Sequence, residues 1–375
     1  LGYPSFKEII MTNVQDKNID LQNKAAEDLV YDSMPYSHVT IDRIAAVAKI
    51  FGIKAQDVSS AKVLEIGCTT GAILIPQAIH HPKSRFVGID ISDEQTKIAE
   101  GQIKELGLKN IEIKTSSISD LLGKADKFDY IICHDVISSV SEKERSDIFD
   151  LCKSSLTPNG IAYISYNTKP GWNMIRGIRE MMLYHSAGFA DPEEKLAQTG
   201  LLLQFMTENA GGANPENPYT QIFLQEVQQI QADTSGSLLY DYLTRVNHQF
   251  YFHEFASEAK KHNLQYVGDL SLPSMYVKNL PPKAASKLAE INDIVRSEQY
   301  MDFITNRRFR SSLLCGDKVG LNRNVTNDSI KDLYFSGYVL PAKPISEVDI
   351  DDESEISFSY NNPNLNFHTS YPADR

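Results

Sequence analysis

The sequence predicts an α/β fold built around a doubly wound parallel sheet, and three features indicate it. Short apolar runs alternate with stretches whose apolar residues recur every three or four positions, as strands alternate with helices. The apolar run at 62–66 enters a glycine-containing turn at 67–71, and a helical pattern follows over 72–79. Asp90 ends the next strand, FVGID. Such a unit binds a nucleotide-like ligand at the carboxyl ends of its strands, where an acidic residue about twenty positions on holds a ribose.

The other elements of the sheet follow in chain order. Thr40 is placed to cap an amphipathic helix over 41–51, and Ser92 begins a capping box. The remaining predicted elements are a helix at 92–106, strands at 111–114 and 128–133, a helix at 142–156, a turn at 157–160, a strand at 161–165, a helix at 252–262 and a strand at 265–270. Five strand–helix units in this order fit a parallel sheet with right-handed crossovers.

The residues of the glycine turn discriminate between two classes of ligand. A dinucleotide fingerprint needs a middle glycine so that the backbone can touch a pyrophosphate, but Thr69 stands there, between Gly67 and Ala72. Glu65 just upstream would repel a phosphate, whereas its carboxylate suits the ammonium group of S-adenosylmethionine. The alternative is a glycine turn in an α/β protein that binds no ligand.

The run from Glu65 to Gly71 resembles the first motif of class I S-adenosylmethionine-dependent methyltransferases, with Thr69 in place of the usual glycine. The resemblance implies a Rossmann-like fold, S-adenosylmethionine as cofactor and S-adenosylhomocysteine as product. In this family the residues after the third strand clamp the adenine, and an amino-terminal arm often lies over the cofactor, which makes Tyr36 and His38 candidate lid residues. The cofactor-binding residues implied are Glu65, Gly67, Thr69, Gly71, Asp90, Ile91, Ser117, Ile118, His134 and Tyr36.

A second resemblance covers most of the chain from about Tyr31 onward, and the runs that carry it begin at Ser165. The runs at 165–172, 217–219, 252–256 and 299–310 are similar to methyltransferases that carry a regulatory domain. That group includes bacterial protein-lysine methyltransferases that modify outer-membrane surface proteins. The resemblance therefore implies a protein substrate with exposed lysines and a homodimer formed through the helical insertion.

The chain is expected to divide into five parts. They are an arm or lid at 1–40, a methyltransferase domain at 41–166 and 249–272, a helical insertion at 167–248, a helical middle domain at 273–345, and an acidic linker with the start of a further domain at 346–375. The basic cluster Arg307, Arg308 and Arg310 has two interpretations. Its arginines either pair with acidic residues of the chain itself or grip an acidic or peptide substrate.

Composition excludes several other classes of protein. A net charge of −12 over 375 residues argues against binding to a nucleic-acid backbone, which requires a basic face. The four cysteines form no CxxC pair, so we expect reduced thiols in a cytoplasmic protein without a metal site. No apolar run is long enough for a membrane span, so no membrane insertion is expected. The chain begins at Leu1, as a trimmed sequence would, and the resemblance implies that relatives continue past residue 375.

Methyl transfer to lysine needs alignment of the two reactants and a deprotonated amine. The lysine pKa is about 10.4, so the site must help to remove a proton at neutral pH. The candidate catalytic residues at the strand ends are Tyr166 or His134 as proton acceptor, Asn167 to orient the amine, and Trp172 to face a methylammonium. For His134 the alternative is a polar cap on its strand, and for Trp172 a hydrophobic anchor at the start of a helix. Two other functions remain open, namely methylation of a small molecule and a non-catalytic, cofactor-binding regulatory role.

Overall fold

A computed structural model describes residues 34–124, 126–189, 191–213, 216–232, 242–244 and 246–334, with shorter pieces at 339–341, 347, 356–360 and 366–369. Most of the expected arm, 1–33, lies outside the described residues. The chain forms two compact units, 1–329 and 330–375, which are described separately.

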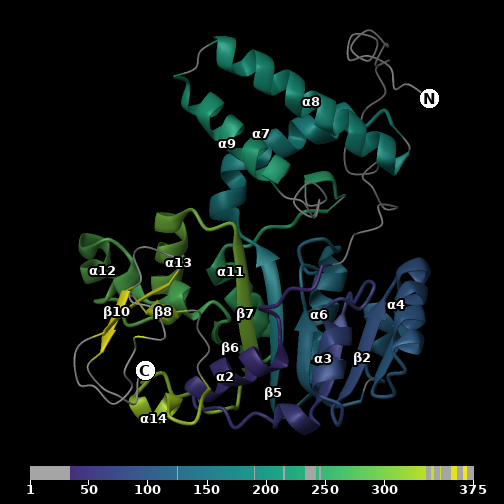
Figure 1. Cartoon of the computed structure of the whole chain (residues 1–375), viewed down its shortest axis with the longest axis vertical. Helices are drawn as coiled ribbons and strands as arrows, with labels where there is room; N and C mark the ends of the chain where they lie inside the picture. Colours follow the sequence, from purple (N-terminus) through teal and green to yellow (C-terminus); the bar gives the residue numbers. More distant parts are fainter. Residues whose placement is uncertain are drawn as a thin grey trace. The chain divides into compact units, whose positions relative to one another are not determined.

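The first unit is built on a seven-stranded sheet in the order β3-β2-β1-β4-β5-β7-β6 (Figure 1). Strands β1 to β5 pair in parallel, and β7 runs antiparallel to both of its neighbours, β5 and β6. The strands are β1 (Lys62–Ile66), β2 (Arg85–Asp90), β3 (Ile111–Thr115), β4 (Phe128–Cys133), β5 (Leu156–Asn167), β6 (Leu264–Asp269) and β7 (Phe309–Gly316). The predicted α/β class and the parallel order of the first five strands are confirmed.

Helices cover both faces of this sheet because successive strand residues point to opposite sides. Val63 and its strand neighbour Leu64 belong to separate hydrophobic clusters, one on each face. The first face carries α2 (Ile41–Ile50), α3 (Leu74–His80) and α4 (Asp93–Glu105), and the second carries α5 (Ile118–Leu121), α6 (Glu142–Ser155) and α11 (Phe252–Lys261). Thr40 and Ser92 accept the capping hydrogen bonds that the sequence predicts, from the backbone N–H groups of Arg43 and Gln95.

The region 273–345 is not a separate helical domain, which corrects one predicted boundary. It contains α12 (Pro282–Leu288) and α13 (Ile294–Thr305), but it also supplies β7 between β5 and β6. The sequence concealed this strand because Arg310, a charged residue, occupies a fully buried position in it. The short helical elements are η1 (Val58–Ser60), η2 (Leu272–Met275), η3 (Val277–Asn279) and α14 (Asn327–Ile330).

The expected helical insertion follows β5 directly, and Figure 1 shows its helices beyond the carboxyl end of that strand. It comprises α7 (Lys169–Ser186), α8 (Pro192–Ala213) and α9 (Pro218–Ala232). Ile175, Ile178 and Met182, at helical spacing on α7, are buried in a separate core that also contains Phe223 of α9.

The second unit contains a three-stranded antiparallel sheet in the order β10-β9-β8. Its strands are β8 (Val339–Pro341), β9 (Ile356–Tyr360) and β10 (Asn366–Thr369). In the part of the chain that the structure describes, no helix is long and apolar enough to cross a membrane. All four cysteines are buried and unpaired, as expected for reduced thiols.

Candidate functional site

The site lies where the order of the strands changes direction. Strand β1 has β2 on one side and β4 on the other, so the order of the strands reverses between the loops after β1 and β4. Open α/β sheets bind their ligands at the carboxyl edge at such a point, and we call this place the crevice. The loop after β1 turns with positive φ at Gly67 (72°) and Gly71 (80°), a conformation that favours glycine. The start of the loop is anchored on β2, because the N–H groups of Gly67 and Cys68 both donate to the carbonyl of Ile89.

Gly67 is also the point where the loop after β1 meets the loop after β4. A Cβ atom at Gly67 would collide with Cγ2 of Val136. We therefore expect Gly67→Ala to destabilise the fold by about 2 kcal/mol or more, through backbone strain and this clash, and to weaken cofactor binding. Urea denaturation and cofactor titration measure the two effects. Gly101→Ala, in α4 with no neighbour within 4 Å, is the control and should be neutral or stabilising.

Asp90 organises the crevice at the end of β2. Its Oδ2 accepts a hydrogen bond from the N–H of Thr69 (3.0 Å), and its Oδ1 accepts one from the N–H of Ser92 (2.9 Å). A carboxylate offers about four lone-pair positions, so two remain for ribose hydroxyls. Thr69 takes a φ of 45° where related motifs have glycine, and its hydrogen bond to Asp90 stabilises this strained conformation. The adjacent Ile91 is 76% exposed and offers an apolar surface beside the ribose position.

Glu65 is a buried carboxylate at the end of β1, only 2% exposed. Its Oε2 has no hydrogen-bond partner among the described residues. Burial, reinforced by the charge of Asp90, raises the pKa of Glu65 well above its usual range. An unsatisfied buried carboxylate at this position fits a cationic group such as the ammonium of S-adenosylmethionine, which would restore its missing interaction.

The raised pKa of Glu65 predicts that cofactor affinity depends on pH. Where Glu65 is protonated in the free protein, binding of a cation must expel the proton, so affinity should rise with pH and level off above the raised pKa. Calorimetric titration between about pH 5 and pH 9, in two buffers that differ in ionisation enthalpy, would detect the proton release. The variant Glu65→Gln should bind more weakly and lose this dependence. A pH-independent affinity in the wild type would contradict the prediction.

The two residues expected to clamp the adenine lie at the start of α5. Ser117 caps this helix, accepting from the N–H of Asp120 (3.3 Å) and donating its hydroxyl to the Asp120 carboxylate (2.6 Å). Ile118 is buried in the hydrophobic cluster on that face of the sheet. The hydroxyl of Ser117 is thus already hydrogen-bonded within the helix cap. The carboxylate of Asp120 is a second polar group at this edge of the sheet, to which the sequence analysis assigned no role.

Aromatic side chains from three distant segments meet at the end of β4. The ring of His134 lies 4.4 Å from that of Tyr36 and 6.1 Å from that of Phe309 at the start of β7. Nδ1 of His134 lies 2.8 Å from the hydroxyl of Tyr163. Burial, with a smaller contribution from His38, lowers the pKa of His134 to about 3, so this imidazole is neutral at physiological pH. The structure therefore brings Tyr36 and His38 to the site, as the lid interpretation expects.

Three of the predicted catalytic residues are buried instead of lining an open channel. Tyr166 is fully buried and stacks on Phe255 at 4.0 Å. Trp172 packs in the core of the insertion, and the Arg308 guanidinium lies 5.7 Å from its ring. Asn167 is also buried, and its Nδ2 donates to Oδ1 of Asn247 (3.3 Å). The expected methylammonium partner of Trp172 is thus replaced by an arginine of the chain, which favours the anchoring role.

The basic cluster pairs internally, which confirms the first of its two interpretations. Arg307 contacts Asp269 at 2.8 Å, and Arg308 contacts Glu226 at 2.8 Å. Arg310 is fully buried and makes ion pairs of 2.8 Å with both Glu298 and Asp302. None of these guanidinium groups is therefore left to grip a substrate.

The sequence places Asp135 with His134 at the end of the fourth strand, facing the reaction cleft, but gives it no role, and it does not place Phe309 at the site. Phe309 reaches His134 only because β7 lies beside β5, which the sequence does not reveal. Asp135 follows His134, has a φ of 58°, and its buried Oδ1 has no partner among the described residues. An acidic residue directly after a buried strand was the available signal for it.

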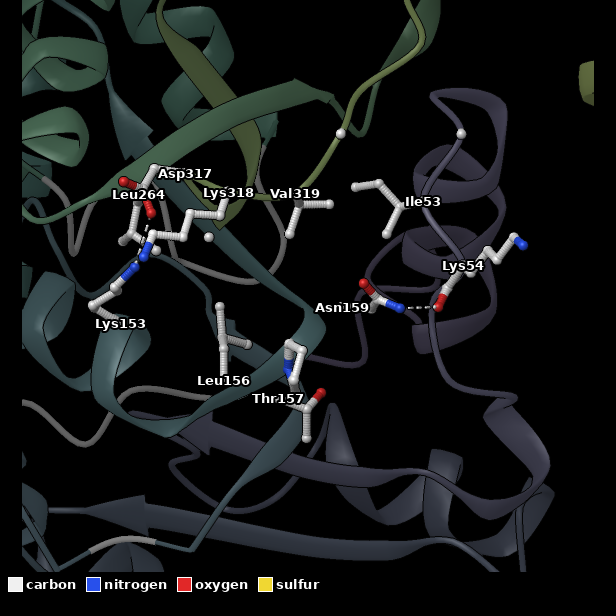
Figure 2. A pocket seen from close by; sticks show the side chains of 14 residues that line it. Ile53, Lys54, Lys153, Leu156, Thr157, Asn159, Leu264, Asp317, Lys318 and Val319 are labelled. Atoms are coloured by element: carbon white, nitrogen blue, oxygen red, sulfur yellow. Dashed lines mark hydrogen bonds and ion pairs between the residues drawn. The ribbon is translucent and has the colours of Figure 1, made fainter.

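A separate cavity of about 600 Å³ lies at the opposite edge of the sheet (Figure 2). It is lined by the start of β5, around Leu156 and Asn159, and by the chain after β7, around Asp317 and Val319. Ligands of open α/β sheets bind outside the carboxyl ends of the strands, and this cavity is at the amino end of β5. We therefore place the functional site in the crevice and not in this cavity.

Comparison with protein families gives two matches along the chain. Residues 57–198 match a family described as a methyltransferase domain, and residues 234–316 match a predicted methyltransferase regulatory domain. The second match includes β6 and β7, so the region named regulatory completes the central sheet and contributes Phe309 to the site.

Individual relatives extend this likeness to most of the chain. The uncharacterized protein RP789 of Rickettsia prowazekii is 46% identical over 92% of this chain and 63% of its own length. The structure of PKMT2 from Rickettsia typhi in complex with AdoHcy is 41% identical, covers 91% of this chain and 65% of PKMT2, and has a TM-score of 0.79. The chain thus spans less than two thirds of the length of these two proteins.

A shorter relative is matched almost completely. The uncharacterized protein RP028 of Rickettsia prowazekii is 38% identical over 64% of this chain and 96% of its own length. Together with the glycine loop, the buried Glu65 and the position of Asp90 at the end of β2, these matches identify the family. The chain belongs to the class I S-adenosylmethionine-dependent methyltransferases that carry a methyltransferase regulatory domain.

Proposed function

We propose that this protein is a protein-lysine N-methyltransferase, which transfers the methyl group of S-adenosylmethionine to lysine side chains of a bacterial outer-membrane surface protein. The observation that carries the proposal is the likeness to PKMT2 over 91% of the chain at 41% identity. The aromatic and acidic lining of the crevice supports it, because such groups attract an ammonium or methylammonium. The absence of an unpaired basic side chain in the Arg307–Arg310 cluster agrees with a cationic target.

Each side chain of the crevice has a distinct task in this reaction. Bound S-adenosylmethionine would supply the methyl group and the positively charged sulfur from which it departs. Asp90 would hold the ribose hydroxyls, and Glu65 would pair with the cofactor's ammonium, so that the cofactor has one orientation. Tyr36 and His38 would cover the site and exclude water around the reacting amine.

We further propose that the protein acts in the cytoplasm as a homodimer that contacts its second copy through the helical insertion. Each helix of the insertion presents a large exposed apolar side chain, among them Met174 and Tyr184 of α7, Phe205 of α8 and Tyr219 of α9. Exposed apolar surface of this kind suits contact with another protein chain. Sedimentation of the wild type and of a Met174→Glu, Tyr184→Glu variant would test the assembly.

The decisive test is transfer of a labelled methyl group. Purified protein, labelled S-adenosylmethionine and either recombinant surface proteins or a metabolite extract should give label on lysine of the protein only. Label in the metabolite fraction would favour the small-molecule alternative. Cofactor binding without label in either fraction would favour the non-catalytic regulatory role.

A further inference from the structure

The proposed reaction needs a group that receives the target amine, and the residues expected for this role do not suit it. Tyr166 is fully buried, and its hydroxyl bonds to Oγ of Ser312 at 3.1 Å. His134 is neutral, and its Nδ1 is occupied by Tyr163 (2.8 Å) and Ser165 (3.2 Å). A neutral imidazole in this state offers no charge to attract a lysine ammonium. The next residue along the chain, Asp135, has a carboxylate, which carries the negative charge that would attract a lysine ammonium.

Asp135 is held in a strained conformation at the cofactor loop. Its φ of 58° is in the left-handed region, where a residue other than glycine costs about 1–2 kcal/mol. Its N–H donates to Oγ of Ser165 (2.8 Å), which attaches it to β5. The following residue, Val136, packs against Gly67. The residue is thus positioned between the cofactor loop and the strand that leads into the insertion.

The carboxylate of Asp135 lacks the interactions that other buried acids of this chain have. Asp269, Glu298 and Asp302 all pair with arginines. By contrast, Oδ1 of the partly exposed Asp135 is buried and has no hydrogen-bond partner in the described part of the chain. A buried carboxylate without a partner is costly, so its retention points to a partner that binds from outside.

Two acids with an unpaired buried oxygen match the two ammonium groups of the reaction. Glu65 and Asp135 are the acids of the crevice with an unpaired buried oxygen among the described residues. The reaction brings together the ammonium of the cofactor and the ammonium of the target lysine. Glu65 lies on β1, below the glycine loop, whereas Asp135 follows His134, whose ring faces Tyr36 and Phe309. The geometry assigns Glu65 to the cofactor and leaves Asp135 for the substrate.

We propose that Asp135 is the catalytic carboxylate that binds the target lysine and accepts its proton, an assignment that rests on the proposed function. The ammonium gives one proton to the carboxylate, and the freed electron pair attacks the methyl carbon. The N–C bond forms while the C–S bond breaks, and the electron pair of that bond goes to sulfur. Asp135 then releases its proton to solvent as the methylated lysine departs.

The titration of Asp135 agrees with this role. Burial raises the pKa of Asp135 to about 6, so the carboxylate is ionised at neutral pH and closer in pKa to a lysine than an ordinary carboxyl group is. Turnover should therefore fall as the pH drops below about 6, because a protonated Asp135 neither attracts the ammonium nor takes its proton. The neighbouring His134, with its pKa lowered to about 3, contributes nothing to this decline.

The test compares Asp135→Asn with a control variant on β4, the strand that precedes Asp135, namely Asp129→Asn. Asparagine tolerates the left-handed region, so Asp135→Asn should fold. It should bind S-adenosylmethionine within about twofold of the wild type, lose roughly 100-fold or more in turnover, and lose the acidic limb of the pH profile. Asp129 accepts from the N–H of Lys62 (2.9 Å) and from Thr157 (3.1 Å), so its variant should lose stability and keep both turnover and pH profile.

The possible results separate this assignment from the proposed function. An Asp135→Asn protein with weak cofactor binding but normal turnover at saturating cofactor would make Asp135 a cofactor ligand and overturn the assignment. Turnover within about threefold of the wild type would overturn it as well. A wild type that binds the cofactor and labels no lysine would overturn the proposed function together with it. As a second variant, Asp135→Glu should keep the acidic limb at a reduced rate.

Discussion

Replacing Arg310 by methionine is expected to lower the free energy of unfolding by about 3–5 kcal/mol. Arg310 is fully buried in β7 and contacts Asp302 through two parallel hydrogen bonds of 2.8 Å. Its Nη1 also contacts Glu298 at 2.8 Å, and its guanidinium lies 3.8 Å from the centre of the Phe252 ring. Methionine fills similar space but leaves Glu298 without a counter-charge and Asp302 with only Arg307, 3.8 Å away, which is the costly way to break a buried ion pair.

The size of this loss should depend on pH. Burial already raises the pKa of Glu298, and removal of Arg310 should raise it further. A group whose pKa is raised in the folded state stabilises it at low pH and loses this contribution as the pH rises, so the variant should be less stable at pH 8 than at pH 5. Urea denaturation at both values measures the effect.

A matched arginine on the surface provides the control for this prediction. Arg176 pairs with Glu180 at 2.8 Å on α7, and its side chain is 76% exposed. Arg176→Met should cost less than about 1 kcal/mol, because exposed ion pairs contribute little. Arg310→Lys, which keeps the charge but loses the planar fork, should give an intermediate loss. Equal stability of Arg310→Met and the wild type would show that the buried network is energetically neutral.

The second large effect is expected at the ribose position, where Asp90→Ala should weaken S-adenosylmethionine binding by about 100-fold or more. The substitution removes acceptors for the ribose hydroxyls, and hydrogen bonds to a charged group contribute about 1.5–3 kcal/mol each. It also releases the N–H of Thr69, which Asp90 holds at 3.0 Å, so the strained loop loses its support. Both effects act in the same direction.

Calorimetric titration with S-adenosylmethionine and S-adenosylhomocysteine measures this loss. Asp93→Ala serves as the control, since Asp93 begins α4 close to Asp90 but pairs on the surface with Lys97. Its affinity should remain within about twofold of the wild type. An Asp90→Ala protein with unchanged affinity would place the ribose elsewhere and remove the main support for the cofactor site.

Local sequence patterns were sufficient to predict the secondary structure of the first part of the chain. The unit from β1 to β2 was predictable because apolar periodicity, the glycine turn and the position of Asp90 are encoded within thirty consecutive residues. The caps at Thr40 and Ser92 were predictable for the same reason. A capping side chain accepts a hydrogen bond from the backbone N–H only three positions further along the chain.

Long-range packing decided what local patterns did not reveal. Strand β7 contains a charged residue that is stable in the sheet only because α13 places Glu298 and Asp302 beside it. Tyr166 and Trp172 have residue types that suit a substrate channel, but they are buried by Phe255 and by the core of the insertion. The direction of a side chain at the end of a strand depends on which helix or strand packs against that end. The sequence does not reveal which element that is.

The sequence by itself determined the α/β class, the parallel pairing of the first five strands and the glycine loop after β1, because short-range periodicity and turn chemistry specify them. The tertiary structure decided the place of β7, the internal pairing of the arginines and the meeting of Tyr36, His134 and Phe309 at one crevice. It also showed that Oδ1 of Asp135 is buried without a partner among the described residues. These features depend on contacts between residues far apart in the chain. Such contacts stabilise the protein only once the sheet is assembled.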